Sequence, residues 1–310
     1  MQTYMGIDFG GTKLLIGELD KEGNILARKR YETGPLDQKS AADRLMSCVR
    51  DYVENVKFVG ELQSAGVGIV GVVDPETGIW KTVNYSEINN IPLGKMVSDV
   101  LQVKTIVDND VKTAVQAELR FGQGKESKDF IYINVGTGLS AGIVTDGKVL
   151  RGAHNDAGEV GHMVIDSNSD VQCICGRKGC AEGVVSGSGI DATARRLAKK
   201  YVTRLAIPDT GRVAAKDVFR LSDEQDELCR VMTDQLVFEL REFILNLIRV
   251  TDPDTIILGG GVMSDGWLFP KVKESLMARM QPGVTRKVVL SSFDAGLVGL
   301  IGAASNAMNL

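Results

Sequence analysis

A short glycine-rich hairpin occurs twice in this chain, and the repeat limits the possible folds more than any other feature. Residues 5–17 (MGIDFGGTKLLIG) resemble residues 133–144 (INVGTGLSAGIV). In each copy an apolar strand enters a Gly-Thr turn and returns as a second apolar strand. Backbone N–H groups and unhindered glycines are what phosphate oxygens require. The repeat therefore predicts two related domains, each with a phosphate-binding turn at the front of its sheet.

The size and charge of the chain agree with two globular domains. It has 310 residues, about twice the length of a typical domain. Its net charge of −4 argues against a nucleic-acid-binding surface, which needs a basic face. No apolar run approaches the roughly 20 residues that span a bilayer, and the N-terminus lacks the pattern of a secretory signal. We expect a cytoplasmic protein that binds neither nucleic acid nor membrane.

Strands and helices are expected to alternate along most of the chain. Apolar runs between glycine-rich turns predict the strands, and helical spacing of apolar residues predicts the helices. The expected strands are 3–9, 13–19, 25–31, 65–71, 105–107, 130–135, 141–145 and 255–258. The expected helices are 39–58, 93–101, 111–121, 189–205, 227–250 and 297–308.

One histidine and three cysteines lie within nineteen residues: His162, Cys173, Cys175 and Cys180. One imidazole and three thiolates form a complete tetrahedral set for zinc, with no position left for water. The metal would then be structural. A disulfide and an iron–sulfur cluster are the alternatives, and the mixed ligand set favours zinc. Glu159 and Glu182 flank these ligands, so a bound metal would fix where both carboxylates point.

These motifs together resemble a known family. Asp8-Phe-Gly-Gly-Thr-Lys13, Gly136-Thr-Gly138 and Gly259-Gly-Gly261 look like the two phosphate loops and the adenosine loop of the actin/hexokinase/Hsp70 superfamily. Within it, Glu159-Val-Gly-His162 and the Cys-x-Cys-Gly-x-x-Gly-Cys-x-Glu element are similar to the ROK family of bacterial sugar kinases.

The resemblance implies a fold and a domain division. The fold class is α/β, with two duplicated actin-like ATPase (ribonuclease H-like) domains and a cleft between them. Residues 1–121 would form the N-terminal domain, with the C-terminal helix at about 297–310 packing back on it. Residues 122–296 would form the second domain. ROK repressors carry a winged helix ahead of the kinase-like part. Because the first phosphate loop starts at residue 6, no such element is expected here.

The resemblance also implies roles for individual residues. Asp110 would be the general base, although an aspartate at this place could instead be only the N-cap of the following helix. The sugar would be bound by Gly71, Asn84, Asn109, Asp110, Glu159, His162 and Glu182. ATP and Mg²⁺ would be bound by Asp8, Gly10, Gly11, Thr12, Lys13, Gly136, Thr137, Gly138, Gly259, Gly260 and Gly261. Zinc would be held by His162, Cys173, Cys175 and Cys180.

The implied activity is ATP-dependent phosphorylation of a hexose, at the 6-hydroxyl, by a homodimer. Glucose is the first choice of substrate, and N-acetylglucosamine, N-acetylmannosamine, fructose, allose and β-glucosides stay open. Val72 stands where some N-acetylmannosamine kinases have Arg, which disfavours that sugar. Val111-Lys112 also stands where the family usually has Ala-Asn. The alternative function is a sugar-sensing regulator of the same family, for which a retained base at Asp110 would be unnecessary.

Overall fold

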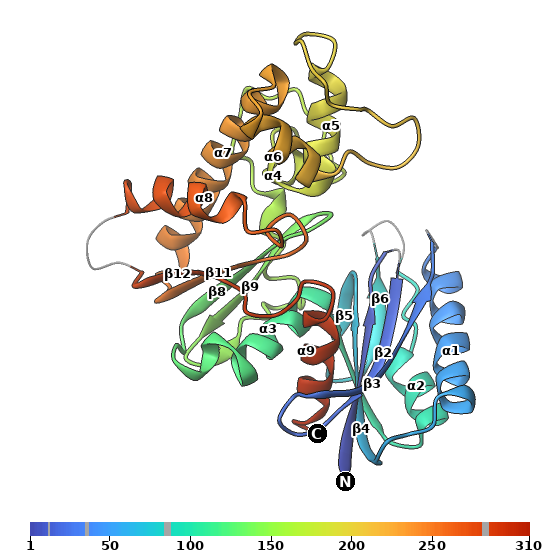
Figure 1. The fold of residues 1–310 in the computed structure, drawn as a ribbon. Coiled ribbons are helices and arrows are strands. Elements are labelled where there is room, and N and C mark those ends of the chain that lie inside the picture. The colour runs from blue at the N-terminus through green and yellow to red at the C-terminus, as the bar shows by residue number, and fades with distance from the viewer. Residues whose placement is uncertain (12, 35–36, 84–87, 281–284) are drawn as a thin grey trace. The chain divides into compact units, whose positions relative to one another are not determined.

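The computed structural model of this protein describes residues 1–11, 13–34, 37–83, 88–280 and 285–310. The fold is α/β, with two five-stranded sheets and one two-stranded sheet (Figure 1). The chain divides into two compact units. Unit 1 comprises Met1–Glu126, Val149–Ala157 and Gly296–Leu310, and unit 2 comprises Ser127–Lys148 and Gly158–Ala295. Each unit has its own apolar core.

Unit 1 is built on a five-stranded sheet with the order β3-β2-β1-β4-β7. A small hairpin, β5-β6, forms a second, two-stranded sheet. Strands β1 to β3 are antiparallel neighbours, whereas β4 and β7 run parallel to β1. The strands are β1 Gln2–Phe9, β2 Lys13–Leu19, β3 Ile25–Glu32, β4 Glu61–Ile69, β5 Val72–Asp74, β6 Ile79–Thr82 and β7 Lys104–Asn109. The helices are α1 Gln38–Asn55, α2 Leu93–Leu101, α3 Asp110–Phe121, the 3-10 turn η1 Gln123–Lys125, and α9 Val298–Ala307.

Unit 2 repeats this sheet with the order β10-β9-β8-β11-β12. Strands β8 and β9 are antiparallel, and β11 and β12 run parallel to β8. The expected duplication of two actin-like domains is therefore confirmed. The strands are β8 Phe130–Val135, β9 Leu139–Thr145, β10 Lys148–Val149, β11 Thr255–Gly259 and β12 Lys287–Leu290. The helices are the 3-10 turn η2 Val160–His162, α4 Glu182–Val185, α5 Gly187–Leu197, α6 Ala215–Asp223, α7 Glu227–Thr251 and α8 Leu268–Met277.

The last helix of the chain, α9, packs on the first sheet, beside β1, β4 and α3 (Figure 1). Two strand glycines permit this approach. A Cβ atom on Gly6 would lie 2.2 Å from the Leu300 carbonyl oxygen, and one on Gly66 would lie 1.9 Å from that of Ala303. Since any side chain at these positions would push the helix away, the glycines of β1 and β4 set where α9 can lie.

One predicted helix is shorter than expected. The helix predicted over 189–205 ends at Leu197. The Asp226 carboxylate accepts hydrogen bonds from the backbone N–H of Arg204 at 2.7 Å and from the Thr203 hydroxyl at 2.9 Å. These bonds hold 203–204 at the start of α7, where Asp226 is also the N-cap. A tertiary contact therefore keeps residues 203–204 out of the helix that their local sequence pattern favours.

In the part of the chain that the structure describes, the helices are too short or too polar to cross a membrane.

Candidate functional site

The first glycine turn of unit 1 joins β1 to β2. The Gly10 N–H donates to the Lys13 carbonyl at 3.0 Å, which closes the turn. The Lys13 ammonium donates to the Gly296 carbonyl at 3.2 Å, just before α9. A Cβ atom on Gly11 would have no heavy atom within 4 Å, so the space over this residue is open. Thr12, the remaining residue predicted for this turn, lies outside the described residues.

Asp8 stands at the end of β1, at the base of this turn. Helix α9 packs closely on Asp8 at Gly299. A Cβ atom on Gly299 would lie 2.5 Å from the Asp8 carboxyl carbon, so a side chain there would clash. Burial raises the pKa of Asp8 to about 6; the Lys13 ammonium opposes that shift and the Asp110 carboxylate adds to it. Burial disfavours the ionised form of a carboxyl group, and a nearby cation stabilises that form. Asp8 can therefore serve as a magnesium-binding group.

Asp110 is the first residue of α3, and it is not the N-cap. That position belongs to Asn109, whose side-chain oxygen accepts from the N–H groups of Val111 at 3.0 Å and Lys112 at 3.2 Å. The Asp110 carboxylate accepts a hydrogen bond from the Val111 N–H at 2.9 Å. Burial raises the pKa of Asp110, while the bond from Val111 and the charge of Lys112 oppose the shift. A carboxylate with a raised pKa is suited to accept a proton.

Gly71 and Asn109 contact each other in unit 1. The Asn109 side-chain amide donates to the Gly71 carbonyl at 3.2 Å. Gly71 has φ +99°, and a Cβ atom there would lie 2.2 Å from the Thr82 carbonyl oxygen, so only glycine fits. Val70, beside Gly71, lines a hollow that also touches Gly10 and Gly11. Asn84, which was also predicted to bind sugar, lies outside the described residues.

One ion pair and one hydrogen bond close to Asp110 in the sequence were not predicted. Arg151 donates to both carboxylate oxygens of Asp108, at 2.9 and 2.7 Å. The Lys112 ammonium donates to the Asn155 carbonyl at 2.8 Å. The pairing of Asp108 with Arg151 was not predicted, because the two residues are 43 positions apart and no local motif links them.

The second glycine turn, Gly136–Gly138, joins β8 to β9 in unit 2. The N-terminus of α5 lies behind it: the Gly187 N–H donates to the Gly136 carbonyl at 2.8 Å, and the Ser188 N–H donates to that of Thr137 at 3.0 Å. The Glu182 carboxylate accepts from the Leu139 N–H at 2.9 Å. Glu182, predicted to meet the sugar, therefore also supports this turn.

The third glycine loop, Gly259–Gly261, lies next to the second turn. Gly259 pairs with Asn134 across the parallel β8–β11 ladder, and the Val262 N–H donates to the Val135 carbonyl at 2.9 Å. Gly260 has φ +93°, and a Cβ atom there would lie 2.4 Å from the Val135 carbonyl oxygen. The carboxyl ends of two parallel strands thus bring both glycine segments of unit 2 together.

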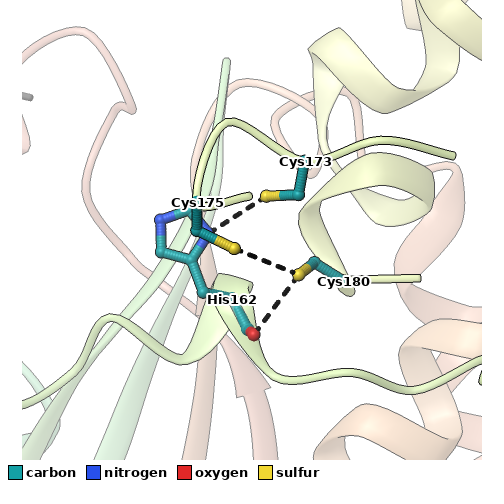
Figure 2. A group of neighbouring side chains, drawn as sticks. All are labelled: His162, Cys173, Cys175 and Cys180. Carbon is teal, nitrogen blue, oxygen red and sulfur yellow. Dashed lines mark hydrogen bonds between the residues drawn. The ribbon is translucent and has the colours of Figure 1, made fainter. Parts of the chain in front are cut away.

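The predicted zinc ligands gather in one place in unit 2. Figure 2 shows His162, Cys173, Cys175 and Cys180 with their side chains directed toward one another. The possible ligand atoms all lie within 4.8 Å of one another. The Cys173 sulfur is 3.3 Å from His162 Nδ1, and the Cys175 sulfur is 3.6 Å from that of Cys180.

The separations of 3.3 Å and 3.6 Å are close to those around a tetrahedral zinc ion. Zinc bonds of about 2.0–2.3 Å place neighbouring ligand atoms about 3.5–3.8 Å apart. Cys173, Cys175 and Cys180 form no disulfide. Hydrogen bonds from Arg177 lower the pKa of the Cys175 thiol, which favours the thiolate that binds a metal, whereas burial raises the pKa of the neighbouring Cys180 thiol. The residues present are therefore compatible with zinc.

His162 and Glu159 are held on one short element. Both belong to the turn around η2, where Glu159 precedes the first residue and His162 is the last. A Cβ atom on Gly161 would lie 2.0 Å from the Leu139 carbonyl oxygen, so glycine lets η2 pack on β9. Because Leu139 follows the second glycine turn, η2, the cysteine cluster and that turn form one connected region of unit 2.

Comparison with known proteins identifies the class. Residues 4–309 match the ROK family, and the chain belongs to it. It is 30% identical to a glucokinase of Halalkalibacterium halodurans over 96% of this chain and 93% of that one.

Two solved structures share its fold over nearly the whole chain. A ROK family glucokinase from Streptomyces griseus, in complex with glucose and AMPPNP, is 26% identical, with a TM-score of 0.81 over 99% of this chain and 100% of that one. A ROK family transcriptional regulator, a homolog of the E. coli MLC protein, is 25% identical, with a TM-score of 0.84 over 98% of this chain and 77% of that one.

Proposed function

We propose that this protein is an ATP-dependent sugar kinase that transfers the γ-phosphoryl group to the 6-hydroxyl of a hexose. One observation carries the proposal: Asn109 takes the cap of α3, which leaves the carboxylate of Asp110, with its raised pKa, available as a base. Membership of the ROK family and the likeness to a glucokinase bound to glucose and an ATP analogue support it.

In the proposed mechanism, Asp110 accepts the proton of the sugar hydroxyl as that oxygen attacks the γ-phosphorus. A positioned base contributes about 10²–10⁴-fold to such a reaction. The rest comes from positioning and charge neutralisation, since phosphoryl transfer asks little covalent chemistry of the protein. Asp8 and Lys13 at the first glycine turn are suited to hold Mg²⁺ and phosphate oxygens.

Unit 2 is proposed to contribute binding groups from the region around its two glycine segments. Backbone N–H groups of Gly136–Gly138 would bind phosphates, and Gly259–Gly261 would border the adenosine. Glu159, His162 and Glu182 would bind sugar hydroxyls. His162 directs Nδ1 toward Cys173, so zinc would bind this nitrogen and the second nitrogen would meet the sugar. The metal, when bound, would fix the loop that carries these groups.

A cytoplasmic homodimer with glucose as preferred sugar belongs to the same proposal. The glucokinase names of its relatives favour glucose. The choice among hexoses depends on one or two side chains at the sugar, so the N-acetylhexosamines are the first alternatives to test.

The likeness to a transcriptional regulator supports a second candidate, a sugar sensor without turnover. A carboxylate with a raised pKa at Asp110 argues against it, because binding a sugar does not require proton transfer.

One experiment separates the two. ADP release is measured with Mg-ATP across a panel of hexoses and N-acetylhexosamines, for the wild-type protein and for Asp110→Ala. A kinase turns over one sugar strongly, and the variant binds that sugar without turnover. If the wild-type protein binds a sugar but releases no ADP with any of them, the sensor replaces the kinase.

A further inference from the structure

The segment Val149–Ala157 occupies an unusual place in the fold. It lies between two stretches of unit 2 in the sequence, yet it packs with unit 1. We infer that Arg151 and Lys112 fasten this segment on both sides of Asp110 and act as positioning residues for the base. The inference rests on the proposed kinase function and names residues that the family resemblance did not assign.

The first attachment is the pair of Asp108 and Arg151. Asp108 is 1% exposed, and both of its carboxylate oxygens accept from the Arg151 guanidinium. One of these oxygens also accepts from the Asn109 N–H at 2.9 Å. The pair therefore fixes the backbone directly before Asp110. Because the contact is bidentate, it sets the orientation of the two side chains as well as their distance.

The second attachment is Lys112, two residues after Asp110. Its side chain is in the first turn of α3, and the residue is 3% exposed. Its ammonium donates to the carbonyl of Asn155 at 2.8 Å. A lysine is seldom buried without a partner for its charge. The contact attaches the part of the segment around Asn155 to α3. The Lys112 ammonium is also close enough to Asp110 for its charge to act on that carboxylate.

The segment between these attachments is a closed turn. The Ala157 N–H donates to the Arg151 carbonyl at 3.1 Å. Gly152 and Asn155 both have positive φ, of 72° and 60°, as a tight turn requires. Because Glu159 follows two residues later, the same turn leads from the surroundings of the base to the element that carries Glu159 and His162.

Several charged groups surround Asp110, and each affects the test. Asp8 faces it from the end of β1, with Lys13 of β2 beside Asp8. Lys112 faces it from α3 and lowers its pKa. The neutralised pair of Asp108 and Arg151 stands before it, and the segment itself also carries His154 and Asp156. Removal of Lys112 alone therefore deletes a positive charge near Asp110.

The test uses the full-length protein and the sugar that it phosphorylates best. Lys112→Met and Arg151→Lys are compared with Lys104→Met, an exposed lysine at the opposite end of β7. Arg151→Lys keeps a cation for Asp108 and so avoids an unpaired buried charge. Thermal unfolding of each variant is recorded first, and kcat and KM are then measured from pH 5 to pH 9.

We expect kcat to fall about 10- to 100-fold in Lys112→Met and about tenfold in Arg151→Lys, because small displacements of a catalytic group have effects of this size. KM for the sugar should change less than kcat. In Lys112→Met the acid limb of the kcat profile should also move to higher pH, since the cation that favours the Asp110 carboxylate is gone. A purely structural role would leave that limb in place. Lys104→Met should match the wild type.

Two outcomes overturn the inference, and they differ from failure of the proposed function. Wild-type kcat in both variants, or equal losses of kcat and thermal stability with an unmoved acid limb, would show that the segment only supports the fold. If Asp110→Ala itself keeps wild-type turnover, the proposed base is wrong, whatever the two variants do. Loss in Asp110→Ala together with wild-type behaviour of Lys112→Met and Arg151→Lys would reject the positioning role alone.

Discussion

The two glycine turns of this protein have the same topology and different surroundings. The turn of unit 1 follows Asp8 and precedes Lys13, so charged side chains stand at its own ends. The turn of unit 2 has no charged residue of its own between Gly136 and Gly138. It is supported instead by the Glu182 carboxylate and by the first N–H groups of α5.

This difference suggests how a duplicated fold divides its tasks. Both copies place a turn rich in backbone N–H groups at the end of a central strand. Unit 1 adds carboxylates whose pKa values are raised by burial, at Asp8 and Asp110. Unit 2 adds a cluster of one histidine and three cysteines that could hold a metal ion. One copy is therefore suited to acid–base chemistry, and the other to rigid binding.

The largest expected effect comes from breaking the His–Cys cluster of unit 2, the one such group found among the described residues. Structural zinc contributes about 10–16 kcal/mol to small zinc modules, so its loss should disorder the loop that carries His162. We expect Cys175→Ser to lose bound zinc and sugar binding together, as measured by metal analysis and calorimetry. Cys48→Ala, a change to a buried thiol of unit 1, should keep the zinc. Normal sugar affinity in metal-free protein would refute the supporting role of the metal.

The next effect tests the acid–base role of unit 1. Asp110→Asn keeps the size of the side chain but removes the base, so kcat should fall by about 10²–10⁴-fold. The affinity for sugar, measured by titration calorimetry, should change little. The matched change in unit 2 is Glu182→Gln, which should weaken sugar binding more than it lowers kcat. Equal effects of the two substitutions on kcat would remove the proposed division between the units.

A smaller effect should distinguish the glycines. Gly260→Ala forces a side chain at φ +93° against the Val135 carbonyl, which should cost about 1–3 kcal/mol of unfolding free energy. Gly11→Ala meets no atom within 4 Å and should leave stability within about 0.5 kcal/mol. Its affinity for Mg-ATP should still fall, because the new methyl group occupies open space over the turn. Denaturant unfolding and nucleotide titration check both, and a strongly destabilised Gly11→Ala would contradict this view of the first turn.

The smallest effect is a pH dependence from Asp8. Its carboxyl has a pKa of about 6, so it is ionised at pH 7 and becomes protonated as the pH falls. The apparent affinity for Mg-ATP should then drop, by about tenfold for each unit well below pH 6. Asp8→Asn should bind weakly at every pH, without this slope. A wild-type dissociation constant that is the same at pH 5 and pH 7 would exclude Asp8 as the magnesium-binding group.

Local patterns predicted much of the fold. The helix expected at 93–101 has those bounds, and the strands expected at 3–9 and 13–19 differ from β1 and β2 by at most one residue. These segments are amphipathic or apolar, and each has a glycine or a proline within two residues of one end. β12 and α8 were not predicted; α8 contains Pro270, a residue that local rules place outside helix interiors.

The sequence by itself determined the repeated hairpins, the ROK family and the four residues of the metal cluster. Each depends on neighbouring residue types, which remain readable before folding. Only the tertiary structure decided that Asn109 rather than Asp110 caps α3, and that Asp108 pairs with Arg151. It also decided that α9 closes on β1 and β4. Such contacts join positions far apart in the chain, and their choice depends on which surfaces the folded core brings together.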